Sequence, residues 1–195
     1  TVGVTGAFIA LCWAAIPLTV QPQAPTADAA RLERAAQAIR EFSLFFAALA
    51  IITTAAVWHG ISALRLKKMA ADRWATTGDH LAYGATLAIG VPLTLLGLLR
   101  GQPLFIAFGA LCLWGGWGDM KFVRHPPDAR GAWLLRHLQS MLGGATAALT
   151  AFCVLGLRRV WPELGEYALF FWIAPVVLGT VGSIAWTRVY RARLG

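Results

Sequence analysis

The chain has 195 residues, of which 58% are hydrophobic and only 13% charged, and it carries a formal net charge of +8. Soluble domains contain about 25% charged residues, so this composition excludes a soluble globular fold. The basic residues lie in short clusters at the ends of apolar runs. This placement is typical of topology signals and headgroup contacts, and it argues against nucleic-acid binding.

Six apolar runs are each long enough to cross a bilayer, because a helix needs about 20 mostly apolar residues to span the hydrocarbon. We expect membrane spans near residues 3–20, 42–66, 80–99, 103–119, 133–157 and 167–188. The sequence therefore predicts an all-α integral membrane bundle of about six transmembrane helices, forming a single domain over residues 1–195.

The boundaries of the second and third spans carry several polar signals. An amphipathic helix near 28–41 either lies at the membrane interface or extends the second span out of the bilayer. His59 lies in the second span, roughly 9 Å inside the charged boundary at Arg65. Asp79 is placed to cap the third span, and Pro92 is expected to bend it.

The third and fourth spans are joined by the tight reversal 100–103, where Gly can end one helix and Pro can begin the next. We expect an antiparallel hairpin here. Asp119 stands at the C-terminal end of the fourth span, where the helix dipole disfavours an anion, so a cationic partner is predicted. The candidate partners are Lys121, Arg124, Arg136 and His137.

The fifth span has Arg136 and His137 just inside its first end. His137 shares one helical face with three small residues, namely Ser140, Gly144 and Ala148. Small residues let helices approach closely, so this face is predicted to pack against another span beneath an ionisable head.

Six spans place both termini on the same side of the membrane. Most of the 17 Lys and Arg residues fall on that side, which predicts that both termini are cytoplasmic in a bacterial inner membrane, with basic clusters contacting anionic headgroups. The chain begins at Thr1 and enters an apolar run without a basic leader or cleavage site. This start is typical of a fragment or a processed form of a longer protein.

His59 and His137 are the leading candidates for chemistry, since both lie at similar depth on different spans. They could ligate a b-type haem, or a divalent metal together with Asp119. Alternatively, each histidine donates a hydrogen bond between helices, within a structural polar cluster that also contains Asp119 and Arg136. Proton or ion transport is a further possibility, although no acidic residue lies in the middle of a span.

Two segments, WHGISALRLKK and WLLRHLQSMLGGATAALTAF, flank the pair Asp119 and Lys121. This arrangement resembles the C-terminal part of an uncharacterised family of bacterial predicted membrane proteins. Members of that family typically contain a Trp-x-x-x-His-x-x-x-Met-x-Gly helix followed by Thr-Ala-Phe. The matching positions are Trp133, His137, Met141, Gly143, Thr150, Ala151 and Phe152. The resemblance covers roughly the second to fifth spans and implies no activity. The earlier spans with a His-Arg pair that usually precede this region in the family are absent here.

The function expected from the sequence is that of a non-enzymatic structural or accessory subunit that binds other membrane subunits. Small-residue faces suit helix packing, and no catalytic motif is present. The alternatives are a haem- or metal-binding redox protein that uses His59 and His137, and a small transporter or proton-conducting protein.

Overall fold

The computed structural model describes residues 29–68, 74–127, 131–157 and 167–194. This part of the chain is 92% helical and contains no strand, which confirms the all-α fold class. Its elements in chain order are α2 (Ala29–Ala63), the 3₁₀ helix η2 (Leu64–Lys67), α3 (Thr77–Arg100), α4 (Pro103–Arg124), α5 (Ala132–Ala151), the π-helical η3 (Phe152–Leu157) and α7 (Ala168–Leu194). The predicted span 3–20 lies outside the described residues.

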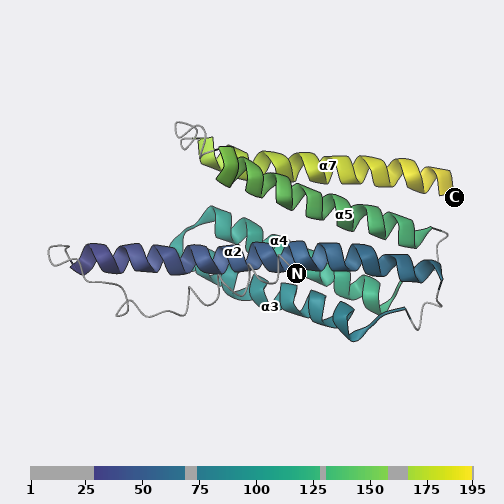
Figure 1. Ribbon diagram of the computed structural model, residues 1–195, viewed down its shortest axis with the longest axis horizontal. Coiled ribbons are helices and arrows are strands. Elements are labelled where there is room, and N and C mark those ends of the chain that lie inside the picture. Colours follow the sequence, from purple (N-terminus) through teal and green to yellow (C-terminus); the bar gives the residue numbers. More distant parts are fainter. Residues whose placement is uncertain (1–28, 69–73, 128–130, 158–166, 195) are drawn as a thin grey trace.

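Helix α2 occupies the centre of the arrangement (Figure 1). The α3–α4 hairpin packs on one side of it and the α5–α7 pair on the other, and α2 contacts both α3 and α5. The end where α2 finishes also holds the start of α3, the end of α4, the start of α5 and the C-terminus. We call this the C-terminal end of the bundle, and the opposite one the α3–α4 turn end.

The predicted amphipathic helix and second span are one continuous helix. Helix α2 runs without a break for 35 residues, so the predicted amphipathic segment continues directly into the second span. At about 1.5 Å per residue such a helix is roughly 52 Å long, well beyond the hydrocarbon thickness of about 30 Å. The part with the length and hydropathy of a span is Arg40–Lys67.

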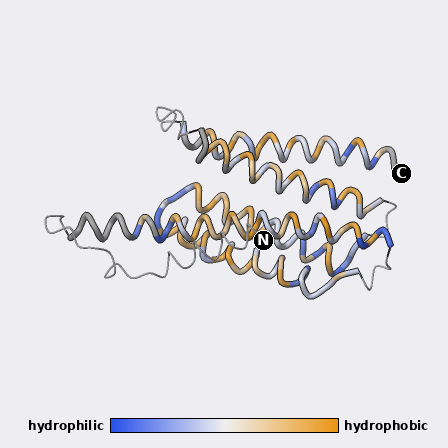
Figure 2. Tube along the Cα trace, in the orientation of Figure 1, coloured by the Kyte–Doolittle hydropathy of each residue, from blue (hydrophilic) through white to orange (hydrophobic). Residues whose placement is uncertain are grey.

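Within the described residues, three helices are long and apolar enough to cross a membrane: Arg40–Lys67, Thr77–Arg100 and Phe170–Ala192. Figure 2 shows apolar residues along the middle of the hairpin and hydrophilic residues towards the helix ends. These features indicate a membrane protein. The remaining predicted spans within the described residues coincide with α4 and α5, which are helical but are not among the three.

The start and end of α3 follow the sequence signals. Thr76 and Asp79 form a reciprocal capping box at its first turn, which satisfies backbone N–H groups that a helix start leaves free. Gly101 ends the helix with a left-handed φ of 63°, a conformation that costs glycine little, and Pro103 begins α4. The predicted antiparallel hairpin is therefore present.

Glycines set the close approach of α3 and α4. A Cβ added at Gly97 would lie 2.7 Å from the backbone nitrogen of Ile106, and one at Gly109 would lie 2.7 Å from the backbone nitrogen of Thr94. The buried residues of α3 recur every three or four positions, at Tyr83, Thr86, Gly90, Leu93 and Gly97. This spacing places the buried residues along one face of α3, where the glycines let the backbones of α3 and α4 come close together.

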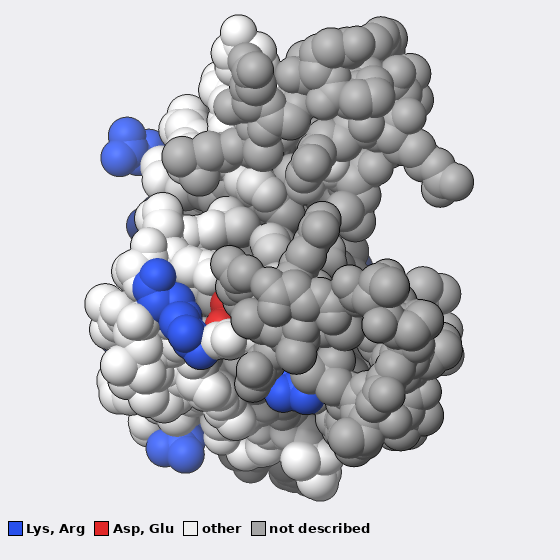
Figure 3. Space-filling view, turned by 90° about the vertical axis from the view of Figure 1, so that its left-hand side faces the viewer, with Lys and Arg blue, Asp and Glu red and all other residues white. Residues whose placement is uncertain are grey.

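An aromatic cluster joins three helices near the α3–α4 turn end. The Phe45 ring from α2 stacks on Phe105 at 5.3 Å between centroids, and meets Phe108 and Trp172 edge-on at 5.2 and 5.0 Å. Phe45 and Phe105 are fully buried. The same end also carries an ion pair in which Arg100 Nε lies 3.2 Å from Glu41 Oε1. Figure 3 looks onto this end and shows acidic and basic side chains next to each other.

Candidate functional site

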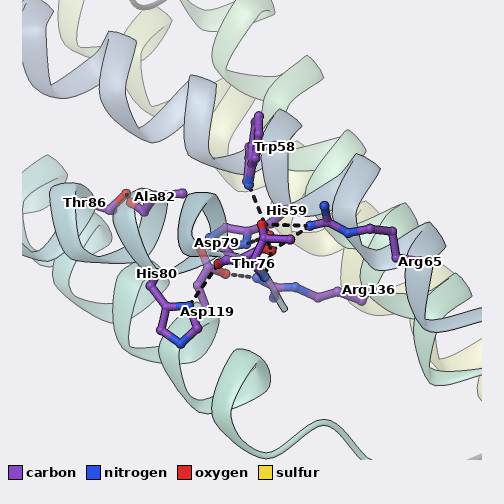
Figure 4. A network of polar contacts seen from close by, with 10 residues as sticks. All are labelled: Trp58, His59, Arg65, Thr76, Asp79, His80, Ala82, Thr86, Asp119 and Arg136. Carbon is purple, nitrogen blue, oxygen red and sulfur yellow. Dashed lines mark hydrogen bonds and ion pairs between the residues drawn. The ribbon is translucent and has the colours of Figure 1, made fainter. Parts of the chain in front are cut away.

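A network of ionisable side chains lies where α2, α3, α4 and α5 meet, towards the C-terminal end of the bundle (Figure 4). His59 comes from α2, Asp79 from α3, Asp119 from α4 and Arg136 from α5. His59 and Asp79 are 2% and 0% exposed, while Asp119 and Arg136 are 15% and 16% exposed. We call these four residues, together with Arg65, the polar network.

Asp79 is the most heavily bonded member of the network. One carboxylate oxygen accepts hydrogen bonds from the Thr76 backbone N–H and hydroxyl, both at 2.8 Å, and lies 2.6 Å from the Arg65 guanidinium. The other accepts a hydrogen bond from the Trp58 indole at 3.1 Å. Ser62 donates a further side-chain hydrogen bond to this carboxyl group. A buried carboxylate needs such partners, because an unpaired charge away from water is strongly unfavourable.

Gly78 gives Trp58 the room to reach Asp79. A Cβ at this position would lie 3.0 Å from Trp58 Cε2, and closer still to Cζ2. Trp58, Ser62 and Arg65 are spaced by four and three residues, so they share one face of the α2 helix and its 3₁₀ extension. That face is the one presented to the start of α3.

The His59 ring lies between two carboxylates. Its Nδ1 atom is 3.8 Å from Asp79 Oδ1, and its Nε2 atom is 3.5 Å from Asp119 Oδ2. Neither distance is that of a good hydrogen bond, and Nε2 has no hydrogen-bond partner among the described residues. His59 is thus buried and oriented towards two negative groups without a close bond to either.

Asp119 has a cationic partner, as the sequence predicts, although α4 does not end there and continues to Arg124. Arg136 forms the ion pair, and its guanidinium carbon also lies over the Phe122 ring, 5.1 Å from the centroid. The pair links the end of α4 to the start of α5. With a neutral His59, the two carboxylates and the two guanidinium groups of the network balance in charge.

The other histidine of the predicted cluster, His137, faces a different group. Its Nδ1 atom lies 2.7 Å from the Gly60 carbonyl oxygen, and since that oxygen can only accept, Nδ1 is the donor. His59 and His137 therefore make different contacts, the first with carboxylates and the second with the α2 backbone. Within the described residues, no group of three or more His, Cys, Asp or Glu side chains is placed to hold a metal ion.

The residues of the Trp-x-x-x-His-x-x-x-Met pattern form the seam between α5 and α2. Lys67 lies over the Trp133 ring at 5.2 Å from its centroid, His137 bonds Gly60, and Met141 fills the space beside that glycine. The three residues are about one helical turn apart, so they line one face of α5. They pack that face through a cation–π contact, a hydrogen bond and a methionine side chain.

The predicted small-residue face of α5 packs along part of its length. Ser140 is 7% exposed and lies beside Gly60. Gly144 is also buried, and a Cβ there would lie 3.3 Å from a Val57 methyl group. Ala148 is exposed, so the buried part of the face ends before it.

Sequence reasoning placed Asp119 beside Arg136 but treated Asp79 only as a helix cap. Asp79 is a cap, and it is also the centre of the bonds from Arg65 and Trp58. One sequence signal could have revealed this role of Asp79. Three hydrogen-bond donors, Trp58, Ser62 and Arg65, are spaced so that they lie on one helical face and can bind the same acceptor.

Comparison of the chain with protein-family models, with curated proteins and with solved structures finds no match. The resemblance noted from the Trp-x-x-x-His-x-x-x-Met pattern therefore stays a prediction.

Proposed function

We propose that this protein is a multi-pass component of the bacterial inner membrane that acts as a non-enzymatic structural or accessory subunit of a larger membrane assembly. The proposal rests on the contacts that the ionisable residues make inside the bundle. Asp79 binds Arg65 and Trp58 and so joins α3 to α2 and its 3₁₀ extension, while the ion pair of Asp119 with Arg136 joins α4 to α5. Groups committed to holding helices are not free to act on a substrate.

The distribution of basic residues supports a cytoplasmic C-terminal end. Among the residues with described side chains, those at this end are Arg65, Lys67, Lys68, Lys121, Arg124, Arg136, Arg188 and Arg191, whereas Arg40 and Arg100 lie towards the opposite end. Lys and Arg are enriched on the cytoplasmic side of membrane proteins. In the proposed orientation the exposed members of this group contact anionic headgroups, and the predicted six spans leave both termini in the cytoplasm.

A redox protein that ligates haem or a metal through His59 and His137 is the main alternative. One observation favours it: the His137 Nδ1 proton is fixed by the Gly60 carbonyl, and histidine ligands commonly bond a carbonyl in this way while Nε2 binds the metal. The surroundings of His59 speak against the pair, because both of its ring nitrogens face carboxylates that are themselves paired with arginines.

Purification of the full chain from its own membranes in a mild detergent tests the proposal. We expect the protein mass of the purified particle, without its bound detergent, to exceed the 21.0 kDa of one chain. We expect no Soret band and no stoichiometric metal. A monodisperse single chain with catalytic turnover would contradict the subunit role. A Soret band that disappears in His137→Ala and persists in His80→Ala would establish the haem alternative instead.

A further inference from the structure

Helix α4 lies at the same depth in the bundle as α3. A Cβ added to α3 at Gly97 would lie 2.7 Å from the α4 backbone, and one at Gly90 would lie 3.0 Å from the Cys112 Cβ. Further along the pair, a Cβ at Gly116 would lie 2.9 Å from Leu87. Helix α3 is long and apolar enough to cross a membrane. We therefore expect α4, which packs closely along it, to lie in the membrane as well.

The outward side of α4 consists of small residues and two tryptophans. Five exposed residues on one side of the helix form what we call the outer face of α4: Ala107, Ala110, Trp114, Trp117 and Gly118. The two tryptophans, 72% and 61% exposed, are the only large apolar side chains that this helix, described over its whole length, exposes. Trp114 stands near the middle of α4, about 15 Å from either end, and is therefore too deep for the aromatic belt at the headgroups.

The outward sides of α3 and α7 have a different composition. Leu95 and Leu98 of α3 are 53% and 60% exposed, and Leu178 and Val181 of α7 are 71% and 60% exposed. Aliphatic side chains of this kind suit contact with acyl chains, whereas small residues are enriched where membrane helices pack on one another. Of these three helices, α4 is therefore the one whose outward side suits a helix neighbour.

The predicted span 3–20 has the composition that such a neighbour needs. It has no charged side chain, and three small residues recur in it at four-residue intervals, namely Gly6, Ala10 and Ala14. A second copy of α4 suits the position less well, because the outer face continues into the exposed Lys121 and Arg124. A symmetric dimer in the membrane would bring these cations of both copies together, which disfavours it.

The connection to α2 is long enough for this placement. Gln102, just before α4, donates a hydrogen bond to Glu41 of α2 at 3.1 Å, so these two residues lie at the same level. Helix α2 rises about 18 Å between Ala29 and Glu41. The nine residues that lead from residue 20 to Ala29 reach up to about 30 Å. They therefore cover this rise and about 20 Å sideways, which is two helix spacings.

We propose that the predicted span 3–20 packs antiparallel against the outer face of α4, with Ala10 beside Ala110 and Ala14 beside Ala107. In this register Gly6 lies level with Trp114, where a glycine leaves room for the indole ring. The direction agrees with the predicted cytoplasmic N-terminus, because the span then begins at the C-terminal end of the bundle and ends at the α3–α4 turn end. This packing goes beyond the proposed subunit role and does not depend on it.

Disulfide cross-linking of the full chain in its own membranes tests this packing. Native cysteines are replaced by alanine, Ala10→Cys is combined with Ala110→Cys, and a protease site is placed within residues 21–28. A disulfide forms only when the two Cα atoms come within about 4–7 Å of each other. We expect oxidation to keep the two fragments joined after cleavage until a reductant is added.

Three controls share the depth of this pair but not its position. In two of them the cysteine partner of Ala10→Cys is moved to an exposed site in the middle of another helix, Ala88→Cys on α3 or Gly182→Cys on α7. In the third, the native Cys12 replaces Ala10→Cys, because it lies on the opposite side of the predicted helix. The joined fraction with Ala10→Cys and Ala110→Cys should be at least about five times that of each control.

Three results would overturn the proposal: no disulfide between Ala10→Cys and Ala110→Cys, equally frequent disulfides to α3 or α7, or disulfides that join two chains instead of two parts of one chain. If this variant does not accumulate in the membrane, the pair Ala14→Cys and Ala107→Cys decides by the same criteria. Each of these results leaves the subunit role standing, because that role is tested by the mass of the purified particle.

Discussion

Replacement of Asp79 by asparagine tests how much the polar network contributes to the stability of the bundle. Asn keeps the size of the side chain but removes the charge and one acceptor oxygen, so Arg65 loses its partner and at least one donor faces an amide NH₂ group. Removing one partner of a buried pair costs about 3–5 kcal/mol. Because Arg65 is 33% exposed and can regain water, we expect about 3 kcal/mol, the lower end of that range.

The measurement is reversible unfolding in mixed detergent micelles, followed by helical circular dichroism. Glu41→Gln is the matched control, because its partner Arg100 is 49% exposed and regains water, and the glutamine keeps one oxygen that can accept a hydrogen bond from Gln37 or Gln102; we expect a cost of about 1 kcal/mol. A cost of Asp79→Asn below about 1 kcal/mol, or no larger than that of the control, would show that the Asp79 carboxylate does not hold the bundle together.

Three further changes have defined outcomes. Gly97→Ala should destabilise the hairpin by about 1–3 kcal/mol in the same unfolding assay, because the new Cβ would contact the backbone of α4. Gly84→Ala is the control and should cost no stability, because its Cβ has no atom within 4 Å. Equal effects of the two variants would contradict the close glycine packing of α3 and α4. Phe45→Ala should cost about 3–5 kcal/mol by opening a cavity beside Trp172, and a neutral result would show that the aromatic cluster does not hold α7. A membrane-impermeant reagent should label a cysteine placed within residues 158–163 in spheroplasts, and protection there would reverse the proposed orientation.

The helical architecture follows from signals that are local in the sequence. Apolar length predicts the helices, the Thr76–Asp79 spacing predicts the start of α3, and Gly101 with Pro103 predicts the reversal into α4. Each of these depends on residues within a few positions of one another. The prediction therefore succeeds without knowledge of which helices are neighbours.

The sequence predicts only some of the contacts within the polar network, because most of them join different helices. A cation near Asp119 is predicted by ending the helix at this residue; α4 in fact continues to Arg124, yet Arg136 is that cation. His137 is grouped with them because its predicted depth is similar to that of His59 and it follows Arg136 in the chain. Adjacent residues on a helix point about 100° apart, however, so His137 faces Gly60 of α2 while Arg136 faces α4.

The role of Asp79 was missed for a related reason. A carboxylate three residues after a threonine at a helix start is fully explained by capping, so the neighbouring sequence does not indicate a second partner for Asp79. The contact with Arg65 depends on the crossing of α2 and α3, which brings residues 14 positions apart into contact. Span 3–20 and its packing stay predictions, because they lie outside the described residues.

A double-mutant cycle on Asp119 and Arg136 tests most directly whether the polar network joins the helices. The unfolding free energies of Asp119→Asn, Arg136→Gln and the double variant are compared with that of the unchanged chain. We expect the double variant to lose little more stability than either single variant, with a coupling of at least about 1.5 kcal/mol between the two sites. Losses that add to within about 0.5 kcal/mol would show that the two residues act independently and that α4 and α5 are not tied through this pair.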